Sequence, residues 1–191
     1  YCESSFHDGS SFKSNIDPWI EIGPKRKGSL IGIGPIRNIV LNKDEPDHML
    51  TTSSTGGLFY TDNGGTEWFN GGTDVGWPHS GCQDAVYYPG PNSTEKWFAL
   101  SAYGSGREGR IGLVGGVFRT TDSGSHWDRI ADWNDFISDL PAGANLGLQK
   151  LLFDEKSTNN DHTLFLATEA GLFKCANPCS YDPTWSGIDI L

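Results

Sequence analysis

The sequence repeats one short segment, and this repeat limits the folds that the chain can adopt. Residues 56–68 read GGLFYTDNGGTEW and residues 115–127 read GGVFRTTDSGSHW, so Phe59 and Phe118 lie 59 positions apart. In each copy an apolar run suited to a β-strand leads into a turn rich in Asp, Asn, Ser and Gly. A third copy, AGLFK at residues 170–174, places its Phe 55 positions further on and lacks the turn. A long repeat in which each unit ends in a hairpin is typical of propellers and solenoids.

Each turn contains three kinds of residue with separate tasks. An aspartate accepts hydrogen bonds from turn amides, a glycine takes a positive φ, and a tryptophan returns the chain to a buried seam. We therefore expect a structural role for Asp62, Gly64 and Trp68 in the first copy, and for Asp122, Gly124 and Trp127 in the second.

The second copy resembles the Asp-box, or bacterial neuraminidase repeat, which reads Ser/Thr-x-Asp-x-Gly-x-x-x-Trp with some variation in the Trp position. The matching residues are Thr120, Asp122, Gly124 and Trp127. In the first copy Tyr60 stands where Ser or Thr is usual, and Trp68 comes one residue late. The resemblance implies that the box is a structural turn remote from the ligand-binding face, so neither aspartate is expected to be catalytic.

Two apolar segments precede each hairpin, and they complete a four-stranded unit. These segments are residues 36–41 and 48–53, 83–89 and 96–101, and 148–153 and 163–168. We predict an all-β chain of about three four-stranded antiparallel propeller blades with almost no helix. The expected division is 1–28 for an N-terminal arm and closing strand, 29–72 for blade one, 73–131 for blade two and 132–191 for blade three.

The number of blades bears on completeness. Known propellers have at least about four blades, so we expect a segment of a larger propeller, with a compact three-blade sandwich as the alternative. Tyr1 looks like a processed or truncated start.

Composition excludes some classes of partner. The 191 residues carry a net charge of −10, which argues against nucleic acid, because phosphate binding needs clustered Lys and Arg. No apolar run approaches the roughly 20 residues that span a membrane. The 25 glycines and 7 tryptophans suit a turn-rich β protein packed by aromatic side chains. We expect no cofactor.

Four cysteines admit three pairings. Cys175 and Cys179 flank Ala-Asn-Pro and are close enough to staple a hairpin loop, which leaves Cys2 and Cys82 as the second pair. Disulfides would place the protein outside the cytoplasm. The alternative is half a metal site at Cys175 and Cys179, but no Cys or His lies near them in the sequence to complete it.

Two further patterns resemble a group of secreted proteins. They are Trp-x-x-x-Gly-Pro at residues 19–24 and TGGLF-x-x-x-NGG at residues 55–65. Over about residues 19–175 the chain resembles sortilin-type and Asp-box propellers, most of all the surface proteins exported by the type IX system of Bacteroidota. This resemblance implies a secreted or cell-surface protein that binds protein or glycan without catalysis.

A glycoside hydrolase of the xyloglucanase or sialidase type is the alternative. Xyloglucanase-type propellers carry an acid before the Gly-Gly of a blade, where this chain has Ser54 and Leu113. Glu169 precedes Ala-Gly in the third copy but stands alone, whereas glycoside hydrolysis uses two carboxylates about 5–10 Å apart. The chain also lacks the Arg-Ile-Pro order of sialidases. We therefore assign no catalytic residue, and the alternative places the catalytic residues mostly outside this segment.

The ligand-binding face is predicted from topology. In an up-and-down blade the long connections between the second and third strands and between blades share one face, opposite the Asp-box turns. Long loops are often functional. On this face we expect aromatic and hydrogen-bonding side chains for a glycan or protein ligand, namely Trp77, His79, Tyr103, Arg107, Arg110 and Trp133. Alternatively, Trp77 and Trp133 cap the core.

Overall fold

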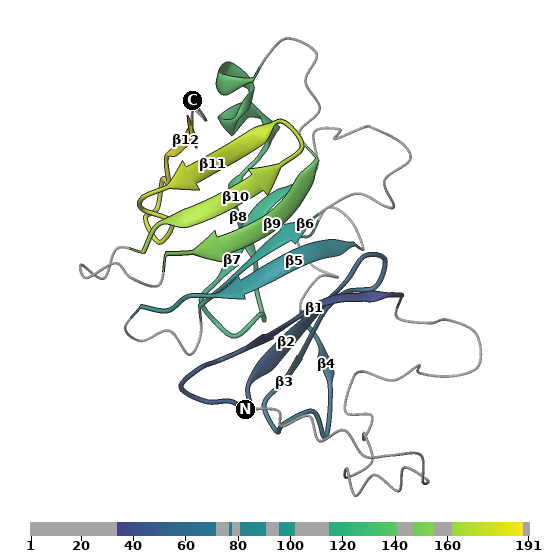
Figure 1. Cartoon of the computed structure of the whole chain (residues 1–191). Coiled ribbons are helices and arrows are strands. Elements are labelled where there is room, and N and C mark those ends of the chain that lie inside the picture. The colour runs from purple at the N-terminus through teal and green to yellow at the C-terminus, as the bar shows by residue number, and fades with distance from the viewer. Residues whose placement is uncertain are drawn as a thin grey trace, which may run out of the picture.

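The described part of the chain forms three antiparallel sheets, each of four strands in chain order (Figure 1). The computed structural model describes residues 34–71, 77, 81–90, 96–101, 115–140, 147–154 and 162–188, without the side chains of residues 133 and 137. The predicted all-β architecture of four-stranded blades is confirmed. Residues 1–28, predicted as an arm and closing strand, lie outside the described residues.

The strands of each blade pair with their neighbours in sequence. Blade one contains β1 (Ile36–Leu41), β2 (Met49–Ser53), β3 (Gly57–Thr61) and β4 (Phe69–Asn70). Blade two contains β5 (Cys82–Tyr87), β6 (Trp97–Ser101), β7 (Gly116–Thr120) and β8 (Asp128–Ala131). Blade three contains β9 (Leu148–Phe153), β10 (Leu164–Thr168), β11 (Gly171–Cys175) and β12 (Trp185–Ile188). The 3₁₀ turns η1 (Trp133–Asp135) and η2 (Ile137–Asp139) precede blade three.

The core consists of two apolar layers, one on each side of blade two. Alternate residues of a strand point to opposite faces of its sheet. Trp97 and Ala99 of β6 therefore belong to the layer shared with blade one, whereas Phe98 and Leu100 belong to the layer shared with blade three. The first strands β1, β5 and β9 lie side by side, with β5 in the middle (Figure 1).

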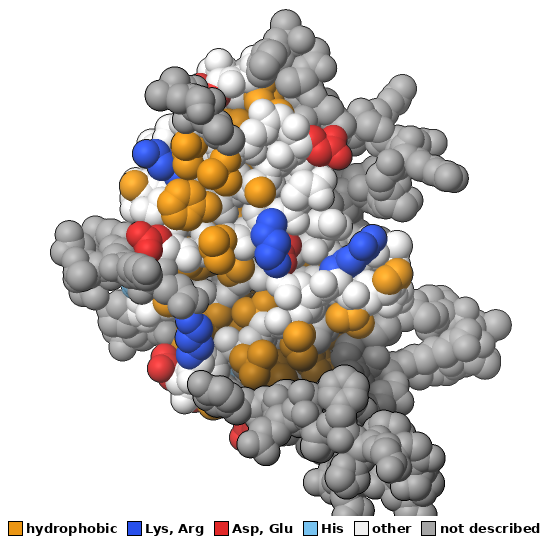
Figure 2. Space-filling model, viewed as in Figure 1, with side chains coloured by type: hydrophobic (Ala, Val, Ile, Leu, Met, Phe, Trp, Pro, Cys, Tyr) orange, Lys and Arg blue, Asp and Glu red, His pale blue; other side chains and the backbone are white. Residues whose placement is uncertain are grey.

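The outer sheets carry exposed apolar side chains. Leu41 of β1 is exposed although its neighbour Val40 packs against the core, and Leu152 of β9 is exposed between two buried residues. In Figure 2 hydrophobic side chains gather both over blade three and near β1, with basic side chains between them. Blade two is thus covered on both faces, whereas blades one and three are each covered by blade two on one face only.

A hydroxyl and a carboxylate organise the outer turn of blade two, by which we mean the connection between its third and fourth strands. The Thr120 hydroxyl donates to Asp122 Oδ1 at 2.8 Å and accepts from the amide of Gly124 at 3.0 Å. Asp122 Oδ1 also accepts from the amide of His126 at 2.9 Å. Ser123 and Gly124 are both left-handed, with φ of 56° and 91°.

The outer turn of blade one has the same hydrogen bonds as that of blade two. They are made by residues one position later than the match between the two sequence copies predicted. Thr61 Oγ1 donates to Asn63 Oδ1 at 2.9 Å and accepts from the amide of Gly65 at 3.0 Å, and Asn63 Oδ1 accepts from the amide of Glu67 at 2.9 Å. The expectation that Asp62 accepts these bonds is therefore wrong. An asparagine side-chain oxygen accepts hydrogen bonds as a carboxylate does. Asn63 therefore takes the role that the sequence pattern assigned to Asp62.

The backbone follows this corrected alignment. Gly64 and Gly65 are left-handed, with φ of 66° and 85°, and they correspond to Ser123 and Gly124 in blade two. Two successive left-handed residues make the turn tight, and a glycine takes this conformation without steric cost.

The outer turn of blade three keeps the same chemistry in a longer loop. Cys175 takes the place of the threonine, and its thiol donates to Asn177 Oδ1 at 3.5 Å. Asn177 Oδ1 accepts from the amide of Thr184 at 3.1 Å, directly before Trp185, as the acceptors of the other two turns do before their tryptophans. The turn that the sequence appeared to lack is therefore present with Cys, Asn and extra residues.

The predicted Cys175–Cys179 disulfide is not formed, because Cys175 is fully buried in the place of the threonine while Cys179 is exposed. Cys82 is likewise a buried thiol that donates to the Asp84 carbonyl at 3.4 Å, so it forms no bridge to Cys2, which lies outside the described residues. Burial raises the pKa of the Cys82 and Cys175 thiols above the ordinary value.

The tryptophans that follow the first two outer turns differ in burial. Trp127 is buried and its indole Nε1 donates to the Gly71 carbonyl of blade one at 2.6 Å, so it joins two blades. Trp68 is only half-buried. The prediction that the tryptophan after the turn is buried therefore holds for Trp127 but only partly for Trp68.

We expect Asp122→Ala to lower the free energy of unfolding by about 1–2 kcal/mol, because the His126 amide loses its acceptor. Burial alone would raise the pKa of the Asp122 carboxyl, but hydrogen bonds from His126 and Thr120 outweigh it, so the pKa lies below its ordinary value. This stabilisation is complete above the unfolded-state pKa of about 3.9 and is lost as the pH falls through the lower folded-state pKa.

Thermal unfolding at several pH values measures both effects. The wild type should melt above Asp122→Ala at pH 7, and the gap should shrink as the pH falls below about 4. A gap of equal size throughout the acid range would contradict the role of the carboxylate.

A matched pair of variants checks the role of Cys175. Threonine and valine have nearly the same shape, but only threonine can donate to Asn177. We expect Cys175→Thr to be more stable than Cys175→Val by about 1 kcal/mol in urea denaturation. Equal stability of the two variants, or a native mass that reveals a Cys175–Cys179 bridge, would contradict the assignment.

Candidate functional site at the inner strands

Each of the three inner strands, β1, β5 and β9, contains one extra residue near its start. Arg37 has no partner between the pairs Ile36–Ser53 and Asn38–Thr52. Gln83 and Gln149 occupy the same position in β5 and β9. Bulges of this kind re-aim side chains and are frequent beside active sites, and here a long polar side chain stands at all three.

The residues that follow the bulges form a polar row across the three blades. They are Asn38, Asp84 and Lys150, which lie at matching register positions of β1, β5 and β9. Asn38 Nδ2 donates to Asp84 Oδ1 at 2.6 Å, and Lys150 Nζ lies 3.2 Å from the same oxygen. The row is therefore one connected hydrogen-bonded group.

Asp84 is the centre of this row. Its side chain is 3% exposed, and its second oxygen, Oδ2, accepts from the amide of Leu151 at 2.8 Å. A buried carboxylate is tolerated when it is paired and hydrogen-bonded, and Asp84 of blade two has partners from both neighbouring blades. Both oxygens of the Asp84 carboxylate thus take part in hydrogen bonds that connect the inner strands, and we assign Asp84 no catalytic role.

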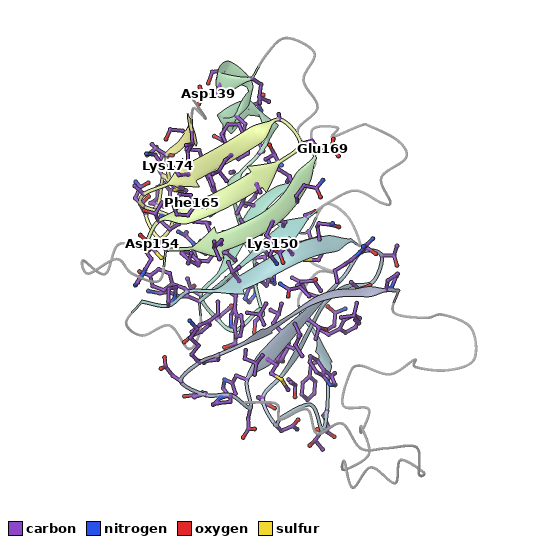
Figure 3. All side chains as sticks on the ribbon, viewed as in Figure 1. Asp139, Lys150, Asp154, Phe165, Glu169 and Lys174 are labelled. Atoms are coloured by element: carbon purple, nitrogen blue, oxygen red, sulfur yellow. The ribbon has the colours of Figure 1, made fainter. Side chains whose placement is uncertain are left out.

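The side chains around Asp84 are accessible. The Lys150 side chain is 61% exposed, and Figure 3 shows it on the side of β9 that faces β5. Gln149 Nε2 lies 3.4 Å from Glu169 Oε1, in the turn between β10 and β11. The Lys150 ammonium therefore lies exposed beside the buried Asp84, and an exposed amide and carboxylate contact each other at the next residue of β9.

These groups share one face of the molecule. The outer turns mark one face, which we call the turn face. The inner strands begin at the opposite end, beside the turns that join the second and third strands; we call this end the loop face. Exposed donors and acceptors on rigid strands suit a ligand with many hydroxyl groups, and the loop face is where the sequence predicted ligand binding.

Of the residues predicted to bind the ligand, Trp77 is the one whose side chain the structure describes, and it lies outside this site. Trp77 is 8% exposed and packs against Phe118 and Trp127, at ring distances of 4.2 and 5.5 Å, so it belongs to the core and its assignment to the ligand face is corrected. The alternative interpretation, that it caps the core, describes it. The remaining predicted side chains, of His79, Tyr103, Arg107, Arg110 and Trp133, lie outside the described part of the structure.

The polar row is absent from the residues predicted from the sequence, although the sequence contains a signal for it. Residues 36–38, 82–84 and 148–150 each read as one apolar residue followed by two polar ones, at the start of an otherwise apolar strand. Alternating strands have single polar positions, so two in succession mark a bulge. The threefold recurrence of this pattern would have identified the row.

Within the described ranges, no three side chains of His, Cys, Asp or Glu are close enough to hold a metal ion. In the same part of the chain, no helix has the length and apolar character needed to cross a membrane.

The fold is similar to that of solved structures. The chain is similar to an ancestral GH74 enzyme, with a TM-score of 0.57 and 16% identity over 88% of this chain and 20% of that one. It is also similar to a GH74 enzyme of Niastella koreensis, with a TM-score of 0.54 and 12% identity over 81% of this chain and 22% of that one. The fold is that of β-propeller blades.

The similarity is limited to the fold at these identities. The chain spans about a fifth of the length of these two enzymes. No protein-family model matches the sequence, and no curated protein matches it significantly.

We expect Asp84→Ala to lower the free energy of unfolding by about 2–4 kcal/mol, because the Leu151 amide and the Asn38 amide group lose their buried acceptor. Lys150→Met is the control, since an exposed ammonium contributes about 1 kcal/mol or less. Urea denaturation measures both variants. A cost for Lys150→Met as large as that for Asp84→Ala would show that the ion pair, rather than the buried hydrogen bonds, holds the row.

Proposed function

We propose that this chain supplies part of the saccharide-binding surface of a glycoside hydrolase with a propeller fold. The observation that carries the proposal is the exposed polar group on the loop face, where Lys150 pairs with the anchored Asp84 and the neighbouring Gln149 contacts Glu169. The similarity of the fold to two GH74 enzymes adds support for carbohydrate as the ligand.

The chemistry of these side chains matches a sugar. Saccharide hydroxyl groups both donate and accept hydrogen bonds, and the amide of Gln149 and the carboxylate of Glu169 offer both kinds of partner. The Lys150 ammonium donates one hydrogen bond to Asp84 and has two further donors, on a side chain whose base lies on a paired strand. Strands hold such groups more rigidly than loops do.

The catalytic carboxylates belong mostly outside this segment under the proposal. Asp84 is buried and bound by three partners, so it is a poor general acid or base. Glu169 contacts Gln149 and is accessible, but hydrolysis needs a second carboxylate about 5–10 Å away. We therefore give Glu169 a binding role.

Non-catalytic binding of protein or glycan at a cell surface is the less supported candidate, because the similar structures are enzymes. Secretion belongs to the proposal, since polysaccharide substrates lie outside cells. Other segments of the same larger protein are the expected partners, and export by a type IX system remains a prediction.

The test is binding of the full chain to an array of plant and microbial polysaccharides and their oligosaccharides. We expect one glycan class to bind, and Lys150→Ala and Gln149→Ala each to weaken binding about fivefold to tenfold, the loss of one hydrogen bond to a hydroxyl. Isothermal titration with the best oligosaccharide gives the affinities.

Lys174→Ala is the matched control, because Lys174 is an exposed lysine on β11 of the same blade (Figure 3). It should leave binding unchanged. Failure of every glycan to bind, or an equal loss with Lys174→Ala and Lys150→Ala, would contradict the proposed site.

A further inference from the structure

A pocket of about 260 Å³ opens between blades one and two on the turn face. Its buried lining comes from Met49, Thr61 and Trp97. Its accessible lining comes from side chains that include Tyr60 and Asp62. Pockets for drug-sized ligands measure about 300–1,000 Å³, so this one suits a smaller molecule.

Asp62 lines the pocket and has no task in the fold. The outer turn of blade one uses Thr61 and Asn63, and the residue between them makes none of its hydrogen bonds. Blade two has Thr121 at the corresponding position. Asp62 is exposed, and among the described residues its carboxylate has no hydrogen bond or ion pair. This negative charge is thus available to a ligand.

Ser123 reaches the pocket from the outer turn of blade two in an unfavourable backbone conformation. Its φ is 56°, and it is the one residue other than glycine with a positive φ in the described part of the chain. The corresponding position in blade one is Gly64, which takes this conformation freely. Strained residues cluster at ligand sites, and Ser123 brings a side chain with a hydroxyl to the lining of this pocket, where a glycine would bring none.

The lining combines aromatic rings with negative charge. Tyr60 and Trp97 supply the rings, and Asp62 supplies the charge. The Nδ1 atom of His48, which also lines the pocket, lies 3.1 Å from Glu45 Oε2. Neither lysine nor arginine is among the described residues that line it. Aromatic faces and carboxylates attract organic cations, because both present negative potential.

We propose that this pocket binds a small organic cation whose ammonium group carries alkyl carbons. The ammonium pairs with Asp62, the alkyl carbons contact Tyr60 and Trp97, and the Ser123 hydroxyl is placed to hydrogen-bond a polar substituent of the ligand. The site lies on the turn face, so it is separate from the saccharide surface proposed for the loop face.

The test titrates the full chain with choline and follows amide signals by two-dimensional NMR. We expect saturable shifts confined to residues 48–49, 60–62, 97 and 123. The neutral isostere 3,3-dimethyl-1-butanol should bind at least fivefold more weakly, because it lacks the charge. Asp62→Asn should weaken choline binding about fivefold to tenfold.

Asp182→Asn is the matched control, since it removes an exposed carboxylate from blade three and changes the net charge equally. It should leave choline binding unchanged. Nα-acetyl-lysine methylamide tests a second source of the same chemistry: tighter binding than choline assigns the site to a lysine of a partner protein, and weaker binding assigns it to a free quaternary amine.

Three results would overturn the proposal. The first is equal binding of choline and its neutral isostere, which would make the pocket a merely apolar one. The second is an equal loss of choline affinity in Asp62→Asn and Asp182→Asn, which would indicate general charge attraction. The third is the absence of saturable shifts at these residues with either cation.

Discussion

The carboxylate of Asp84 is the contact on which the arrangement of the three blades depends. It accepts from Asn38 of blade one and from Leu151 and Lys150 of blade three, while its own strand lies between them. A buried charge is stable only with such partners, so the three inner strands must keep their register for it to remain satisfied. The apolar layers on both sides of blade two hold the sheets together, but apolar contact is not directional. The directional hydrogen bonds of Asp84 align the strands.

The outer turns show how one hydrogen-bonding scheme survives changes of residue. The donor at the end of the third strand is Thr61, Thr120 or Cys175, and the acceptor two positions later is Asn63, Asp122 or Asn177. Each acceptor also binds the amide directly before a tryptophan. What the fold requires here is a small donor followed by a side-chain oxygen, and several residue types meet that requirement.

The two faces of the molecule consequently serve different ends. On the loop face, bulges place polar side chains around an anchored carboxylate at the start of the inner strands. On the turn face, the scheme of the outer turns leaves intervening positions such as Asp62 and Ser123 available to line a pocket. On both faces the repeated strands and turns fix the backbone. Side chains that do not take part in the strand pairing or the turn hydrogen bonds are available to bind a ligand. This separation of frame and site is general among folds that host many functions.

The sequence by itself determined the strands, the blade repeat and the antiparallel class, because alternating apolar residues and turn chemistry act between near neighbours. It did not determine which residues meet across blades. Asp84 lies 46 positions from Asn38 and 66 from Lys150, so no local pattern identifies their contact. Trp77 looked like a ligand contact, yet it is buried because Phe118 and Trp127 of blade two surround it. The sequence predicted a disulfide for Cys175, but its thiol is buried and donates to Asn177 in the place of a threonine hydroxyl. The burial of Cys175 and the position of Asn177 both depend on the folded chain.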